Sequence, residues 1–328
     1  HPAFGGRPRE LVAQDHVYAI KRFYDPRWNS SDLYVYESLK LPGLAELREQ
    51  ARRTRRPFDY DREVEGVRAL DRHTLRITLG VPDPRFVYLA ADAVMMGAVA
   101  REVVEWHGDD IGAHPVGTGP FRLKRWRRGS QIVLERNPGY RRVAYEGQPA
   151  DVPEAQAAAA HLQGRMLPLV DEVVVDVVEE AQPRWLSFLE GRYHALEIPQ
   201  TFRAQAVPGG ELAPYLARRG LQLQRQVRPD MVMNFFFMEH PLVGGYTPEK
   251  VALRRAIGLA FDGPRLRRQV FAGFGLPAQS TVAPGTSGYD GAYKSEMSDH
   301  DPARARALLD LHGYVDRNGD GWREQPDG

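Results

Sequence analysis

The sequence contains 328 residues, which is long enough for two or more lobes with separate hydrophobic cores. Hydrophobic residues make up 42% and charged residues 27%, a composition typical of a folded protein and unlike that of a disordered chain. The 44 Lys and Arg residues nearly cancel the 43 Asp and Glu residues, which argues against a nucleic-acid-binding protein. The lack of cysteine excludes disulfides, thiolate catalysis and cysteine-ligated zinc.

The beginning of the chain is predicted to be mainly helical. Apolar residues recur at helical spacing over 10–24, and Asp25-Pro26 ends this helix. Residues 74–79 alternate apolar and polar side chains, which indicates a short strand, and a helical pattern returns over 98–106. The first helix is therefore expected to face a core.

A group of arginines lies between these elements and is closely followed by acids. The residues are Arg52, Arg53, Arg55 and Arg56, then Asp59, Asp61, Glu63 and Glu65. Because the opposite charges lie so close together along the chain, we interpret this segment as a solvated face.

The middle of the chain is predicted to contain a β-hairpin over 119–138. Apolar and polar residues alternate on both sides of a turn at Gly129-Ser130. Residues 144–163 have little to bury, and we interpret them as a surface excursion with a short helix. A β-branched run over 170–178 is typical of a strand, and a helix follows from Pro183.

The last part of the chain is predicted to mix strands and helices. Two strands are expected over 221–227 and 231–238, the second buried on both faces of the sheet because it is densely apolar. Thr247 and Pro248 are typical of a helix start, and a last helix is expected over 303–311. The pattern is α/β throughout.

Motifs for chemistry are sparse. The sequence lacks a Gly-x-Ser-x-Gly elbow, a His-Glu-x-x-His motif and a phosphate-binding loop. Asp316, Asn318 and Asp320 occupy the first, third and fifth positions of a calcium-loop pattern, with Asp327 at the twelfth. The usual glutamate is missing from that twelfth position and no exit helix follows. We therefore interpret the loop as a hairpin turn and keep a calcium site as the alternative.

Two groups of aromatic residues are candidates for a ligand site. Within residues 234–238, Phe235 and Phe237 would share one face of the predicted strand, where core packing is the first interpretation and a pocket lining the alternative. Tyr34 and Tyr36 would likewise lie together on one face of any extended segment.

The segment His114–Tyr140 carries a long and specific pattern of Gly-Thr-Gly-Pro-aromatic, then Trp, then Gly, then Leu-x-Arg-Asn-Pro-x-Tyr. This pattern closely resembles the signature of bacterial extracellular solute-binding protein family 5, which comprises the dipeptide-, oligopeptide- and nickel-binding proteins of ABC importers. Residues 10–26, 247–262 and 303–314 resemble further elements of the family in the same order. The sequence departs from the family at Gly191–His194, where relatives tend to show Gly-Glu-apolar-Asp.

Both ends of the sequence read as interior loops. Members of the family begin well before the counterpart of His1 and continue far beyond Gly328, so we expect the chain to be truncated at both ends. No signal peptide is visible, and no stretch reaches the roughly 20 apolar residues of a membrane span. Much of the family's ligand pocket is expected to lie outside this chain.

The resemblance implies an α/β protein with the class II periplasmic-binding-protein fold, in which two lobes close on a solute about a hinge. The expected divisions are a family-specific extra subdomain attached to lobe I over 1–112, the lobe I sheet and crossover over 113–235, and the first part of lobe II over 236–328. The expected hinge residues, where small side chains permit unusual dihedral angles, are Gly117, Thr118 and Gly119. The expected ligand-binding residues are Tyr34, Tyr36, Asn234, Phe235, Phe237 and Met238.

The function that the resemblance implies is the substrate-binding component of an ABC importer. Such a protein is expected to be a monomer, periplasmic or membrane-associated outside the cytoplasm, that delivers peptides or peptide-like solutes to permease subunits. Nickel chelates, opines and oligosaccharides are alternative ligands, and a peptide chaperone or sensor would have the same pattern. An α/β hydrolase is the rival from another class, disfavoured because no nucleophile, base and orienting group can be assembled. We expect a binding protein with no cofactor and no nucleic-acid partner, and not an enzyme.

Overall fold

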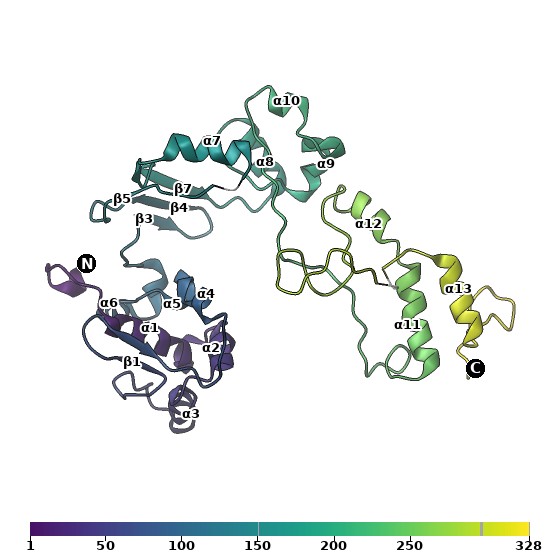
Figure 1. Cartoon of the computed structure of the whole chain (residues 1–328), viewed down its shortest axis with the longest axis horizontal. Coiled ribbons are helices and arrows are strands. Elements are labelled where there is room, and N and C mark those ends of the chain that lie inside the picture. Colours follow the sequence, from purple (N-terminus) through teal and green to yellow (C-terminus); the bar gives the residue numbers. More distant parts are fainter. Residues whose placement is uncertain (150, 296–297, 328) are drawn as a thin grey trace. The chain divides into compact units, whose positions relative to one another are not determined.

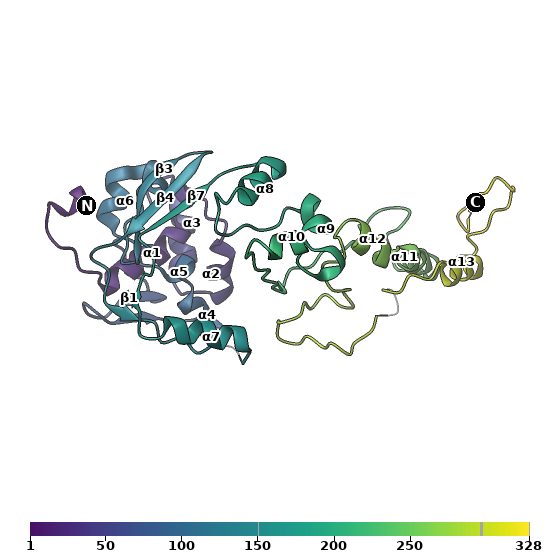
Figure 2. The same ribbon diagram turned by 90° about the horizontal axis from the view of Figure 1, so that it is seen from above.

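The computed structural model describes residues 1–149, 151–295 and 298–327. The chain forms two compact units, His1–Val177 and Val178–Gly328 (Figures 1 and 2). The first unit holds one cluster of buried apolar side chains around its helices, and the second unit holds two smaller clusters. Within the described part of the chain, no helix combines the length and the apolar character needed to cross a membrane.

Helix α1 (Ala13–Tyr24) buries one face in the core of the first unit. Val17, Ile20 and Tyr24 recur at helical spacing on that face and are almost fully buried. The Asp15 carboxylate accepts a hydrogen bond from the backbone N–H of Val12 at 2.8 Å, which satisfies an amide at the helix start. The helix therefore begins a few residues later than the sequence pattern indicated.

Short helices and strands surround α1. Two of them, β2 and α6, confirm the strand predicted over 74–79 and the helix predicted over 98–106. The surrounding elements are α2 (Leu33–Leu39), α3 (Leu44–Thr54), β1 (Val67–Ala69), β2 (Leu75–Ile77), α4 (Phe86–Ala91), α5 (Ala93–Met96) and α6 (Arg101–His107). Strands β1 and β2 pair in antiparallel fashion.

An antiparallel sheet with the order β3-β4-β7 completes the first unit. β3 (Phe121–Arg127) and β4 (Gln131–Arg136) form the predicted hairpin, and Gly129 in its turn has a φ of 68°, which favours glycine. β7 (Glu172–Asp176) pairs with β4 and confirms the predicted strand over 170–178.

The surface excursion that the sequence predicts after this hairpin is a ribbon with a helix between its strands. β5 (Val143–Ala144) pairs with β6 (Met166–Leu167), and α7 (Pro153–Leu162) lies between them along the chain. Most of the described side chains of this segment are exposed or half-buried, as expected for a stretch with few large apolar residues.

The second unit has two groups of packed helices. Trp185 of α8 (Ala181–Leu189) packs with Ala206, Val207 and Leu216, which come from the region of α9 (Arg203–Ala206) and α10 (Pro214–Ala217). Further along the chain, α11 (Pro248–Ala260) and α13 (Pro302–Leu311) bury Ala256, Leu259 and Ala305 against each other, with α12 (Gly263–Gln269) between them in sequence. The helices predicted to begin at Pro248 and near Ala303 are thus confirmed.

The strands predicted over 221–227 and 231–238 do not form, so this prediction was wrong. Within the described residues, neither stretch has regular secondary structure or a partner strand. Val232, Phe235 and Phe237 are exposed instead of buried. A strand needs a neighbouring backbone with which to exchange hydrogen bonds, and an apolar pattern does not provide that neighbour.

Candidate ligand-binding site

The second unit contains an exposed apolar stretch over 231–237, which we call the open segment. Phe235 and Phe237 are 85% and 64% exposed, whereas Phe236 and Met238 are half-buried. This alternation fits a chain whose successive side chains point to opposite sides, and it supports the expectation that Phe235 and Phe237 share one face. Asn234 is also exposed.

The backbone of the open segment is largely unpaired. Among the described residues, no backbone hydrogen bond involves the N–H or C=O groups of residues 231–236. Such groups are strong donors and acceptors, so this stretch can bind the backbone of another peptide segment. Apolar side chains that alternate with these groups provide contact area beside them.

A basic residue on α11 holds the chain just after the open segment. Arg254 donates Nη1 hydrogen bonds to the carbonyl oxygens of Val243 and Gly245 at 2.6 and 2.8 Å. The backbone N–H of Gly245 in turn donates to the carbonyl of Met238 at 2.9 Å. Sequence analysis did not select Arg254, because it resembled the family only as one residue of a helix. The loop carbonyl groups that it binds belong to the backbone and cannot be recognised from the sequence.

The two tyrosines predicted to share a face are separated by the structure. Residues 33–39 form helix α2, so positions two apart point in different directions. Tyr34 is 69% exposed, whereas Tyr36 is 1% exposed and donates its hydroxyl to the backbone carbonyl of Met95 at 2.6 Å. Burial raises the pKa of Tyr36. Tyr36 is therefore a core residue, and the expectation of a shared extended face was wrong.

The residues predicted to form a hinge connect the helical part of the first unit to β3. Neither Gly117 nor Gly119 has a positive φ, and a Cβ atom at Gly117 would meet no atom within 4 Å. Gly117 and Gly119 therefore do not adopt the positive φ that favours glycine, and Gly117 has no close backbone neighbour. The side chain of Asn137 donates to the Gly119 carbonyl at 2.9 Å, which ties this connection to the end of β4.

The compact units divide between Val177 and Val178, whereas the expected divisions fall after residues 112 and 235. Residues 113–119 lie inside the first unit together with both elements that they connect. The three-part division and the role of Gly117, Thr118 and Gly119 in a hinge stay predictions.

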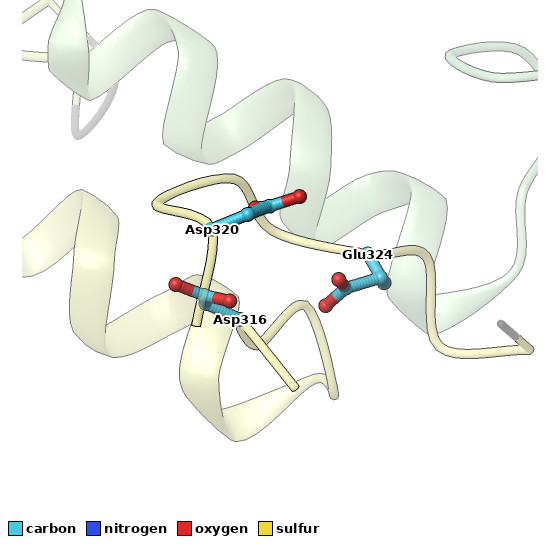
Figure 3. Close-up of side chains that lie close together, drawn as sticks. All are labelled: Asp316, Asp320 and Glu324. Atoms are coloured by element: carbon cyan, nitrogen blue, oxygen red, sulfur yellow. The ribbon is translucent and has the colours of Figure 1, made fainter. Parts of the chain in front are cut away.

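The loop after α13 gathers three carboxylates, as Figure 3 shows. Asp316, Asp320 and Glu324 each offer an oxygen atom, and these atoms lie within 4.8 Å of one another. Glu324, which sequence analysis did not select, is at the ninth position of the calcium-loop pattern. Asp327, expected as the twelfth-position ligand, does not belong to this group.

Hydrogen bonds within the same loop already use these carboxylates. Asp316 accepts from the backbone N–H groups of Gly319 and Gly321 at 2.6 and 2.9 Å. Asp320 accepts from the backbone N–H of Trp322 at 2.8 Å, and Glu324 accepts from the backbone N–H of Arg317 at 2.8 Å. These bonds are those of a tight polar turn, which is the first interpretation from sequence, and the calcium alternative rests on the carboxylate group alone.

A shallow hollow on the first unit is formed by residues that precede or belong to β1 and β2. Its lining consists of Glu63, Val64, Glu65, Arg68 and Arg76. None of the predicted ligand-binding residues is in this lining, and its charged side chains are of both signs. We assign it no role.

Comparisons with known proteins identify the family of the chain. The model of the family described as bacterial extracellular solute-binding proteins, family 5 Middle, matches residues 9–327. The peptide transport periplasmic protein SapA of Salmonella typhimurium is 24% identical over 337 residues, which cover 97% of this chain and 51% of SapA. The glutathione-binding protein GsiB of Escherichia coli O157:H7 is 26% identical over 259 residues, which cover 78% of this chain and 43% of GsiB.

Solved structures give the same result for the fold. OppA of Burkholderia pseudomallei superimposes with a TM-score of 0.60 at 18% identity, covering 94% of this chain and 53% of OppA. The chain thus spans about half the length of the relatives that it matches. It belongs to the bacterial extracellular solute-binding proteins of family 5 and has the fold of the OppA-type periplasmic binding proteins.

Proposed function

We propose that this chain is part of the substrate-binding component of an ABC importer. It binds peptides or peptide-like solutes in the periplasm and delivers them to permease subunits. Membership of family 5 supports this proposal, and so do the names of relatives, one a peptide transport protein and one a glutathione-binding protein. The protein acts as a monomer, without a cofactor, and as a binding protein instead of an enzyme.

The observation that carries the proposal is the open segment. Its unpaired backbone groups can pair with the backbone of a peptide irrespective of the peptide's sequence. Phe235 and Phe237 beside them offer apolar area without a charged group, which suits varied side chains. A site of this kind selects the peptide backbone strongly and the side chains weakly.

The proposed ligand contacts are those predicted from sequence, with one residue removed. Tyr36 is not retained, because its hydroxyl is bonded inside the core and its ring is inaccessible. Tyr34 is retained because it is exposed on α2. The proposed contacts are Tyr34, Asn234, Phe235, Phe237 and Met238.

The proposal is tested by a thermal-shift screen of the full-length protein with short peptides of different lengths. A ligand that binds only the folded state raises stability by about 2.7 kcal/mol at a hundredfold excess over Kd, so a binding peptide raises the melting temperature measurably. The test variant carries Phe235→Ser and Phe237→Ser. Tyr246→Ser is the matched control, since Tyr246 is an 84% exposed aromatic residue of the same unit.

We expect the control to respond to peptide like the wild type and the double variant to lose most of the response. A screen in which no peptide raises the melting temperature would contradict peptide binding. An equal response of the double variant would remove the open segment from the site. A nickel–histidine chelate, an opine and an oligosaccharide belong in the same screen, because a response to one of these alone would favour the alternative ligands.

A further inference from the structure

The end of helix α3 carries an exposed group of positive charges, which we call the arginine cluster. Its members are Arg52, Arg53, Arg55 and Arg56, and all four are exposed. Leu44, Leu47 and Ala51 bury the opposite face of the helix in the core. Figure 1 shows α3 at the periphery of the first unit.

The acids that follow the cluster in sequence do not neutralise it. Asp61 pairs with Arg101 at 2.5 Å, and Glu63 pairs with Arg68 at 3.1 Å. Asp59 accepts two backbone N–H groups of its own turn. All of these charged residues are exposed, which confirms the interpretation of a solvated face, but Asp61 and Glu63 are paired with arginines outside the cluster.

No other carboxylate takes their place in the part of the chain that the structure describes. None of the four arginines makes a salt bridge or side-chain hydrogen bond there, and neither Glu49, on the same helix, nor Glu65 forms an ion pair with them. Many other arginines of this unit form ion pairs, as Arg9 does with Asp15 and Arg122 with Glu135.

The cluster is costly for the free protein. Like charges within one or two helical turns repel each other, and the favourable interaction with the carboxyl end of α3 offsets only part of that repulsion. Arg55 has a φ of 55°, a backbone conformation that residues other than glycine rarely adopt. A bound anionic surface would neutralise this concentration of charge.

We propose that the arginine cluster binds the surface of an anionic phospholipid membrane. Thr54 and Pro57 are the residues between and after the arginines, so the cluster has no aromatic or large aliphatic side chain of the kind that anchors protein interfaces. Long cations at an exposed helix end can reach a plane of phosphate groups without a complementary shape, and their contributions add. This inference does not depend on peptide binding.

The test is cosedimentation of the full 328-residue chain with vesicles of phosphatidylcholine, with and without phosphatidylglycerol. We expect binding only to the anionic vesicles, and loss of binding at high salt, since the Debye length shrinks from about 10 Å at 0.1 M to about 3 Å at 1 M. The test variant replaces the four arginines with glutamine. Each arginine near an anionic surface contributes a factor of about five, so the loss of all four lowers the partition coefficient by up to about 600-fold, and by at least about tenfold if only two of them reach the surface.

The matched control removes the same number of positive charges from exposed, ion-paired positions of the same unit. It carries Arg72→Gln, Arg85→Gln, Arg122→Gln and Arg136→Gln. Circular dichroism melts establish that both variants fold. We expect the control to keep most of the vesicle binding.

Three results would overturn the proposal. One is the absence of wild-type binding to anionic vesicles even at low salt. Another is equal loss in the control, which would assign the effect to net charge. The third is binding to soluble polyglutamate as strong as to vesicles at the same anion concentration, which would point to an acidic protein partner instead. Because peptide-induced stabilisation is measured separately, failure here leaves the proposed function unaffected.

Discussion

The buried tyrosine of α2 offers a sharp test of the core of the first unit. In Tyr36→Phe the ring is unchanged and only the hydroxyl is lost. That hydroxyl donates to the carbonyl of Met95 at 2.6 Å and also lies 3.4 Å from the sulfur atom of Met96. Because Tyr36 is 1% exposed, water cannot replace the missing donor without opening the core.

The loss of folding free energy in Tyr36→Phe comes from the Met95 carbonyl, which is left without a hydrogen-bond donor. A buried carbonyl without a partner costs about 1–3 kcal/mol, and we expect the lower part of this range, because the smaller side chain lets the neighbouring groups relax. For a unit of this size, 1 kcal/mol shifts the melting temperature by roughly 2–4 °C. We therefore expect Tyr36→Phe to lower the midpoint by about 2–8 °C.

The measurement is thermal unfolding by circular dichroism, with Tyr34→Phe as the control. Tyr34 lies on the same helix but is 69% exposed, so loss of its hydroxyl is expected to leave the midpoint unchanged within error. A midpoint of Tyr36→Phe equal to that of the wild type would refute the reasoning. So would a loss of peptide binding in Tyr36→Phe without a change in stability, since this would return the residue to the ligand site.

Three further predictions concern other parts of the chain. The hydrogen bond from Arg9 lowers the pKa of Glu102. The pair therefore stabilises the fold above the ordinary glutamate pKa of about 4.3, and this stabilisation is lost as pH falls through the lowered pKa. The difference in melting temperature between wild type and Glu102→Gln should be largest above about pH 5 and shrink in acid, and a difference that does not change with pH would contradict the pairing. If the loop at Asp316 is a polar turn, melting temperatures in calcium and in chelator should agree, and a clear rise with calcium would establish the alternative. Arg254→Met should speed amide hydrogen exchange at Gly245 without unfolding α11, and unchanged exchange would show that the arginine does not hold this loop.

Local patterns predicted the local elements well. The helices that begin at Pro248 and Pro302 both have proline in the first turn, and the second is also capped by Asp301, whereas the Thr247 side chain makes no capping hydrogen bond. Both signals act within a few residues of chain. The hairpin turn at Gly129 is equally local, because the glycine alone supplies the required positive φ. The interactions that determine such elements are all between residues close together in the sequence.

Elements that depend on distant partners were predicted poorly. Residues 231–238 have the composition of a buried strand, but strand formation depends on a neighbouring backbone that the composition cannot specify. Tyr34 and Tyr36 would share a face only in an extended segment, whereas residues 33–39 form a helix that packs Tyr36 into the core.

The partners of charged residues also could not be predicted from the sequence. Asp61 and Glu63 follow the arginine cluster closely in sequence, but the fold pairs them with Arg101 and Arg68. Which carboxylate meets which arginine is set by the tertiary arrangement of α3, β1 and α6. The same holds for Glu324, which joins the carboxylate group through the path of the loop.

The central claim is that the open segment binds the backbone of a peptide, and amide hydrogen exchange by mass spectrometry tests it most directly. With a saturating peptide identified by the thermal screen, we expect strong slowing of exchange over residues 231–237, because their unpaired N–H groups acquire acceptors. Peptide binding with unchanged exchange in this segment, and protection elsewhere, would contradict the claim.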